Sequence, residues 1–325
     1  MNIDNRFNKS CIFFVISFLM AGNYCRGSET TKGLVAGAEK AVSAGLKSRD
    51  GRVRANAIEV VSAGKKGVFL PKIVELLNDE VVPVRFAAAV ALGDLQYEKG
   101  ENQLQQLLNS PDLNVKVAAA YALCRLGEKQ HLSIIEKAAQ TDDQTVKANA
   151  AMLLGKLKSK ESLTILYSLK DNEDSSDTVA FNATEAIARI GDEKVYPKIW
   201  TMLISVYADD RYMGIRAMGA LGTAKAANAL LTMLDDEVTE VRLAAAEQLG
   251  LLGDISGQFV VLEYLAGSQQ QEKTAVERCN VFAALAIGQI GTGKLIEYLP
   301  KLLKNDSPAV QLAAAKSIFM LAGRN

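Results

Sequence analysis

The residue types that carry most enzyme chemistry are scarce in this sequence. His131 is the only histidine among 325 residues, so no second imidazole is available to complete a metal site or to relay a proton. A nucleophile activated by histidine would have to pair His131 with Cys124 or with a serine, and no surrounding motif supports either pairing. We therefore predict no catalytic residue and interpret His131 as a surface or helix-capping residue.

Ligands for metals or phosphates are also poorly spaced. The sequence has four cysteines, Cys11, Cys25, Cys124 and Cys279, and the two that lie beyond the N-terminal segment do not come within the ligand spacing of a zinc site. The acidic loop 171–177 offers carboxylates that suit calcium, but such a run is more typical of a solvated helix cap. The segment Gly291-Thr292-Gly293-Lys294 is too short for a phosphate-binding loop. No metal and no cofactor are predicted.

Composition favours helices and gives no bulk attraction to nucleic acid. Lys and Arg together number 37, as do Asp and Glu, so the net charge is +0 and nothing draws the whole chain to a polyanion. Apolar residues make up 49% of the chain while aromatic residues make up only 6%. A core built from Ala, Leu, Val and Ile with few prolines indicates packed helices rather than strands.

One segment recurs along the chain at a nearly constant interval. It is seen in VRFAAAVALGDL from Val84, VKVAAAYALCRL from Val115 and VRLAAAEQLGLL from Val241. The first residues of all copies are Val53, Val84, Val115, Val146, Val179, Asp210, Val241, Cys279 and Val310. Most intervals between these anchors are 31 residues. Self-similarity at this period is the signature of a repeat architecture.

The pattern inside each copy predicts a helical hairpin. The residue four after the anchor is always Ala or Gly, and the residue eight after it is always large and apolar, which places both on one helix face. A second amphipathic segment precedes each copy. Asp112, Asp143 and Ser307 stand where helix caps are needed, and glycines such as Gly191 close the helices.

These repeats resemble the short HEAT-like repeats found in phycobilisome lyases. The resemblance is carried by Asp79, Val84-Arg85, Ala87-Ala88 and Ala91-Leu92-Gly93, and it extends from about Lys32 to the C-terminus. It implies an all-α fold, an α-solenoid in which about nine HEAT-like hairpins form an elongated right-handed superhelix. Family members include chromophore lyases, hydroxylases and scaffolds, so the fold does not select a function. The His-Glu pairs of deoxyhypusine hydroxylase are missing, while a bilin-lyase-like enzyme remains an alternative.

The residues that vary between copies on the second helix predict a partner surface. Ten residues after the anchor, three consecutive copies carry a cation, and six residues after it the same stretch carries Val90, Tyr121, Met152, Glu185 and Arg216. The predicted contact residues are Tyr121, Arg125, Met152, Lys156, Arg189 and Arg216. This combination suits a protein or peptide partner, in particular an acidic one, and a non-enzymatic scaffold or adaptor. The alternative is a solvated face whose charges have no specific role.

The N-terminus reads as an export signal. Arg6 and Lys9 precede the apolar run from Cys11 to Gly22, which is shorter than the roughly 20 residues of a membrane-spanning helix. We expect a signal peptide at residues 1–27 and a mature solenoid at 28–325, located in the periplasm or at the cell surface. Alternatively, Cys25 is lipidated and the protein is a membrane-anchored lipoprotein that acts as an assembly factor. We expect the protein to be attached to a membrane only if Cys25 is lipidated.

Three further expectations concern the framework. The last helix ends the array without a polar cap, so its apolar residues Leu312, Phe319 and Met320 are a candidate surface for self-association. Trp200 is interpreted as a large core filler. Basic residues directly after the anchors are expected to pair with acidic turn residues as a structural ladder. These are Arg54, Arg85, Lys116, Lys147, Arg211 and Arg242, facing Asp50, Asp79, Asp143 and Asp236.

Overall fold

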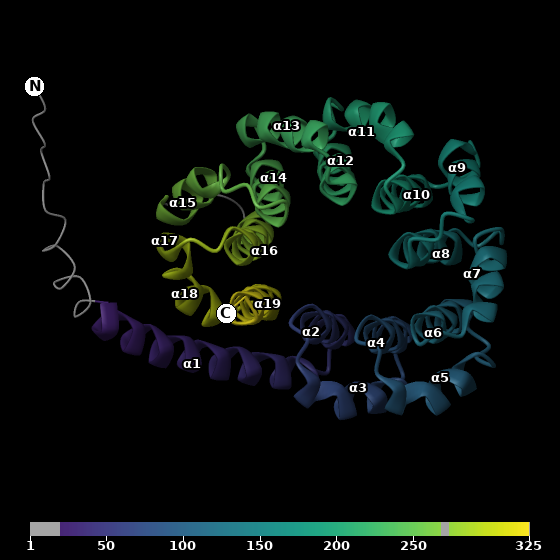
Figure 1. The fold of residues 1–325 in the computed structure, drawn as a ribbon, viewed down its shortest axis with the longest axis horizontal. Coiled ribbons are helices and arrows are strands. Elements are labelled where there is room, and N and C mark those ends of the chain that lie inside the picture. Colours follow the sequence, from purple (N-terminus) through teal and green to yellow (C-terminus); the bar gives the residue numbers. More distant parts are fainter. Residues whose placement is uncertain (1–19, 268–272, 325) are drawn as a thin grey trace, which may run out of the picture.

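Two concentric layers of helices form a ring in a computed structural model that describes residues 20–267 and 273–324 (Figure 1). Within these residues the regular secondary structure is helical. The inner layer consists of α2 (Gly51–Ala63), α4 (Val82–Asp94), α6 (Leu113–Arg125), α8 (Gln144–Leu157), α10 (Asp177–Ile190), α12 (Ala208–Leu221), α14 (Thr239–Leu251), α16 (Lys273–Ile290) and α19 (Pro308–Ala322). These are the helices predicted from the recurring segment, so the all-α solenoid is confirmed.

The outer layer is made of shorter helices, apart from α1. It consists of α1 (Met20–Gly45), α3 (Leu70–Leu76), α5 (Glu101–Leu107), α7 (Leu132–Ala138), α9 (Leu163–Asp171), α11 (Tyr196–Leu203), α13 (Ala224–Thr232), α15 (Gln258–Ala266), α17 (Gly293–Ile296) and α18 (Leu299–Leu303). Short 3₁₀ turns precede or follow several of them, namely η1 (Gly67–Phe69), η2 (Glu98–Gly100), η3 (Lys129–His131), η4 (Glu193–Val195) and η5 (Met233–Asp235). Each outer helix is followed by its inner partner, which makes the predicted hairpin.

Small and large side chains alternate inside the layers as the repeat requires. The alanines four residues after the anchors, from Ala57 to Ala314, are 0% exposed, and the large apolar residues eight after them are at most 3% exposed. A methyl group at the first position lets the neighbouring helix approach, and the branched chain at the second fills the space between hairpins. Since one hairpin cannot bury this face alone, the stacking of neighbours stabilises the array.

The predicted helix boundaries are confirmed by the cap geometry. The side chains of Asp112, Asp143 and Ser307 accept hydrogen bonds from backbone N–H groups at the starts of α6, α8 and α19. Gly191 has a φ of 94°, a left-handed conformation in which glycine carries no steric cost. Glycines at the equivalent position after α6, α12, α14 and α16 also have positive φ.

The basic ladder is confirmed at two rungs. Arg54 forms a bidentate pair with Asp79 at 2.7 and 2.8 Å, and Arg211 forms the same pair with Asp236 at 2.7 and 3.0 Å. Burial opposes ionisation of Asp79, but hydrogen bonds from Arg54 and from the backbone N–H of Val81 outweigh it, so the pKa of Asp79 lies below its usual range. Each rung ties one inner helix to the turn of the next hairpin.

The prediction of an elongated array with an uncapped last helix is wrong, because the array closes on itself. Helix α19 packs against both α1 and α2, so the last repeat covers the first (Figure 1). Phe319 is 2% exposed and Leu312 is 3% exposed. A Cβ atom added at Gly64 would lie 2.7 Å from the Cβ of Phe319, so only glycine allows this approach. The face expected to self-associate is thus largely used within the chain.

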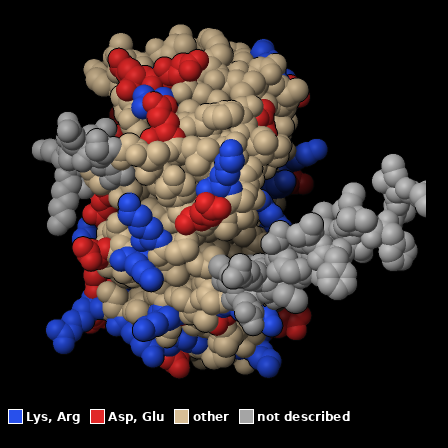
Figure 2. Space-filling model, turned by 90° about the vertical axis from the view of Figure 1, so that its left-hand side faces the viewer, with Lys and Arg blue, Asp and Glu red and all other residues tan. Residues whose placement is uncertain are grey.

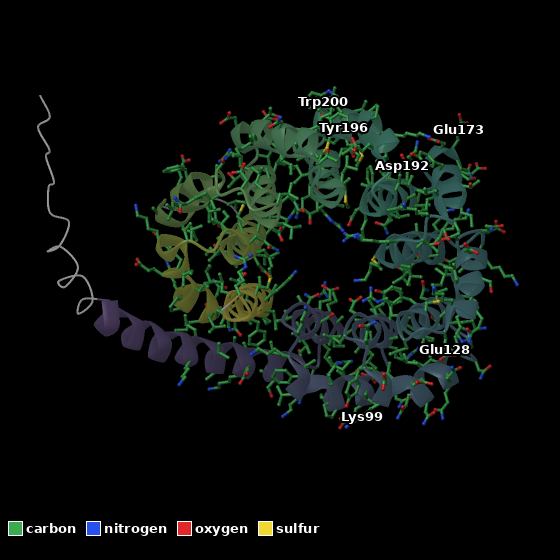
Figure 3. The ribbon with its side chains drawn as sticks, viewed as in Figure 1. Lys99, Glu128, Glu173, Asp192, Tyr196 and Trp200 are labelled. Atoms are coloured by element: carbon green, nitrogen blue, oxygen red, sulfur yellow. The ribbon has the colours of Figure 1, made fainter. Side chains whose placement is uncertain are left out.

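The outer surface holds one correction, and the side of it seen in Figure 2 carries charges of both signs. Trp200 is 39% exposed on α11, where it stacks on Tyr196 with ring centroids 6.4 Å apart, so it is not a core filler (Figure 3). On the side of the ring seen in Figure 2, Lys and Arg are present with Asp and Glu from top to bottom. This face therefore has no extended surface of one sign.

The N-terminal predictions fall largely outside what the structure describes. The greater part of the apolar run from Cys11 to Gly22 lies outside the described residues, and so does the side chain of Cys25. Among the helices that are described, none combines the length and hydropathy required to span a bilayer.

Candidate binding surface on the inner wall

The six residues predicted to contact a partner all lie on four consecutive inner helices. Tyr121 and Arg125 are on α6, Met152 and Lys156 on α8, Arg189 on α10, and Arg216 on α12. The structure therefore brings the predicted set to one wall of the ring. Their exposure to solvent differs. Arg189 is exposed and Tyr121 is 0% exposed. The other four are partly exposed, namely Arg125, Met152, Lys156 and Arg216.

Tyr121 and Lys156 are engaged by one carboxylate from a neighbouring helix. Asp94, at the end of α4, accepts hydrogen bonds from the hydroxyl of Tyr121, from Lys156 Nζ at 2.9 Å, and from Ser62 Oγ at 3.3 Å. Burial, and next the charge of Asp94, raises the pKa of Tyr121, so its hydroxyl remains a donor. Lys156 also lies 5.9 Å from the centroid of the Tyr121 ring. This group joins α2, α4, α6 and α8.

A second carboxylate neutralises two of the arginines. Glu185 on α10 pairs with Arg189 at 2.6 Å and with Arg216 of α12 at 2.6 Å. Together with Asp94 it compensates three of the four predicted cations, so the basic stripe expected to attract an acidic partner carries little free charge. Asp94 occupies the same repeat position as Lys156, and Glu185 the same position as Arg216, so the shared position was a signal for these two pairings, whereas Arg189 lies four residues after Glu185 on the same helix.

A hollow in the inner wall lies between α2, α4 and α8. Its cavity volume is about 630 Å³. It is lined by Phe86, Ala87 and Val90 of α4, by Met152 of α8 and by Ala55 of α2, with Glu59, Asp94, Asn114, Asn149 and Lys156 among its polar lining residues. We call this hollow the α2/α4/α8 groove. Met152 and Lys156 were predicted as contact residues, whereas Phe86, Val90 and Glu59 were missed.

The opposite part of the wall is filled by its own side chains. Tyr212 of α12 and Phe282 of α16 meet across α14 with ring centroids 5.3 Å apart. Arg278 lies 3.4 Å from Glu240 and 3.8 Å from Asp209. Burial raises the pKa of Glu247 on α14, although Lys316 and Arg216 oppose the shift. Charges here are therefore directed at one another.

The surroundings of the two described cysteines disfavour nucleophilic chemistry at their thiols. Burial raises the pKa of the Cys124 and Cys279 thiols to about 11, so both are protonated at neutral pH and are weak nucleophiles. His131 Nε2 lies 3.2 Å from the carboxylate of Glu128. Across the described residues, no group of three His, Cys, Asp or Glu side chains has the arrangement of a metal site.

Fold and inner wall together define an α-solenoid repeat protein whose hairpins close into a ring. A family model described as HEAT repeat matches residues 69–97 and 227–256, and a second, described as HEAT repeats, matches residues 100–178. The chain is a HEAT-like repeat protein, as the resemblance of its repeated segments implied.

Two solved structures are similar to the chain at low sequence identity. The complex of CpcE and CpcF of phycocyanin lyase from Nostoc sp. PCC7120 is 20% identical, with coverage of 76% of this chain and 94% of that chain and a TM-score of 0.46. Human deoxyhypusine hydroxylase is 17% identical, with coverage of 82% and 98% and a TM-score of 0.40. No curated protein sequence matches the chain. These similarities concern the arrangement of helical repeats and assign no activity.

Proposed function

We propose that this chain is a non-enzymatic protein-binding scaffold and that its partner binds the inner wall of the ring. The observation that carries the proposal is the α2/α4/α8 groove. It brings the partly exposed side chains of Phe86, Val90 and Met152 together around one hollow. Exposed apolar side chains with a polar rim are typical of surfaces that bind other macromolecules.

The absence of an enzyme activity is part of the same proposal. The protonated state of the Cys124 and Cys279 thiols supports it. A bilin-lyase-like enzyme is the alternative, and it predicts a bound chromophore. An absorption band in the visible range from the purified protein would favour that alternative over a scaffold.

Position-resolved photo-crosslinking in the native host tests the scaffold directly. A photoreactive benzoylphenylalanine replaces Met152 in the groove in one variant, and Ser168, exposed on the outer helix α9, in the control. We expect a discrete crosslinked protein from the Met152 variant and none from the Ser168 variant. Equal crosslinks from both positions, or none from Met152, would contradict binding at the inner wall.

We also propose that the protein is exported to the periplasm or the cell surface. The support is the basic start and the short apolar run that ends at Gly22. The lipoprotein alternative, a membrane-anchored assembly factor, is favoured by Cys25 at the end of that run. Mass spectrometry of the mature N-terminus distinguishes them, because a chain that starts at Ser28 is a cleaved export product, whereas a lipid-modified Cys25 makes the anchor.

A further inference from the structure

The α2/α4/α8 groove has the size and lining of a site for apolar side chains. Its volume of about 630 Å³ lies within the range of about 300 to 1,000 Å³ that is usual for ligand sites. Phe86 and Val90 from α4 face the groove together with Met152 from α8. Methionine adapts its shape to different apolar neighbours, which suits a surface that receives a side chain from another molecule.

The free charge at the groove is negative. Asp94 is used by Ser62, Tyr121 and Lys156, and the positive charge of Lys156 is compensated by that contact. Glu59 on α2 is exposed, and its side chain makes no hydrogen bond or ion pair with any other described residue. A carboxylate beside exposed apolar groups is complementary to a cation on an apolar ligand.

The rim adds neutral hydrogen-bonding groups that suit a polypeptide. Asn149 Nδ2 donates to Asn114 Oδ1 at 2.9 Å, which fixes both amides at the wall between α6 and α8. Thr145 lies one helical turn before Asn149 and is also part of the lining. Amide and hydroxyl groups beside an apolar floor can accept and donate hydrogen bonds to a peptide segment without adding charge.

We propose that the α2/α4/α8 groove binds a cationic amphipathic segment of a partner protein. The apolar face of the segment packs on Phe86, Val90 and Met152, and a Lys or Arg of the segment pairs with Glu59. This inference rests on the proposed scaffold function and names the chemistry of its partner. It reverses the acidic partner expected from the sequence, because three of the four cations that motivated that expectation, Lys156, Arg189 and Arg216, are paired within the wall.

Two labelled peptides serve as probes for the full mature chain. One repeats Leu-Lys-Lys-Leu-Leu-Lys-Leu, and the other carries Glu at every Lys. In fluorescence anisotropy we expect saturable binding of the cationic peptide only. Glu59→Lys should weaken this binding by about tenfold or more, because charge reversal places a cation beside the cation of the peptide. Glu101→Lys, on the exposed face of the outer helix α5, has the same change in net charge and should leave the affinity unchanged.

A third variant separates the apolar contact from the charge. Met152→Ala removes apolar surface from the groove without altering its charge, so it should weaken the cationic peptide while circular dichroism stays unchanged. Tighter binding of the acidic peptide, no binding of the cationic peptide, or equal losses from Glu59→Lys and Glu101→Lys would overturn the proposal. If photo-crosslinking at Met152 still captures a protein in those cases, the scaffold function stands and only the chemistry of the partner is wrong.

Discussion

The α2/α4/α8 side and the α12/α14/α16 side of the inner wall are built from the same repeat. They differ in the side chains that fill the space in front of the inner helices. Phe86 on α4 and Tyr212 on α12 both lie two residues after their anchors. Tyr212 meets an aromatic partner two inner helices further on, since Phe282 of α16 lies 5.3 Å away between ring centroids. The corresponding part of α8 presents Asn149 to the groove lined by Phe86. One side is therefore closed and the other is open.

This difference separates the repeat positions that pack the helices from the positions that shape the inner wall. The residues that pack the layers, such as Ala88 and Ala245, are the same on both sides, and both are 0% exposed. The side chains that decide between an open groove and a filled wall occupy positions that the packing leaves free to vary. We expect substitutions at those positions to alter binding, and substitutions in the layers to alter stability.

The largest effect should come from the junction that joins the two sides into one ring. Phe319→Ala removes a side chain that is 2% exposed and packs beside Gly64, so we expect a loss of about 3 to 5 kcal/mol in the free energy of unfolding. Chemical denaturation followed by circular dichroism measures it. The matched control is Phe259→Ala, because Phe259 is 75% exposed and its loss should change stability by less than about 0.5 kcal/mol.

The next effect tests whether one side is filled and the other open. Phe282→Ala should cost about 3 kcal/mol, because it leaves a cavity beside Tyr212. Phe86→Ala, which only widens an existing groove, should cost about 1 kcal/mol. The midpoints of urea denaturation for the two variants provide the comparison. Equal losses would mean that the groove side is packed as tightly as the other.

Much of the framework was predictable from the sequence, because each helical hairpin is determined by residues within one copy of the repeat. The anchors, the alanines four residues later and the caps at Asp112 and Asp143 each follow from spacing within one copy. Ring closure was not predictable in this way. It depends on the small rotation between successive hairpins, summed over the whole array, and only then does Phe319 reach Gly64.

The location of the candidate site was predictable from the sequence, but the charge that it presents to a partner was not. The variable positions located the inner wall correctly, and they included Met152 and Lys156 of the groove. The number of cations did not reveal that Asp94 pairs with Lys156 across an intervening helix. These two residues are 62 apart in sequence. Such pairing depends on the curvature of the wall, which no single repeat encodes.

A smaller effect is expected when the open side is made to resemble the filled side. Asn149→Phe places an aromatic ring in the α2/α4/α8 groove, as Phe282 does beside Tyr212. The affinity for the cationic peptide should fall about tenfold, while stability changes by less than about 1.5 kcal/mol because the groove has room for the ring. Anisotropy titration and thermal denaturation measure the two quantities. Ser168→Phe, which adds a ring on the exposed outer face of α9 and leaves the groove open, is the control and should retain the binding.

The smallest effect concerns the filled side and depends on pH. Burial raises the pKa of Glu247 in the folded ring above that of the unfolded chain, so the folded state binds its proton more tightly. Stability from this group is therefore fully present below the usual glutamate pKa of about 4.3 and is lost as the pH rises through the folded pKa. Glu247→Gln removes the penalty for a buried charge, so its Tm should exceed that of the natural chain at neutral pH and approach it in acid. A variant in which the exposed Glu263 of α15 is replaced by Gln should show no such pH-dependent gain.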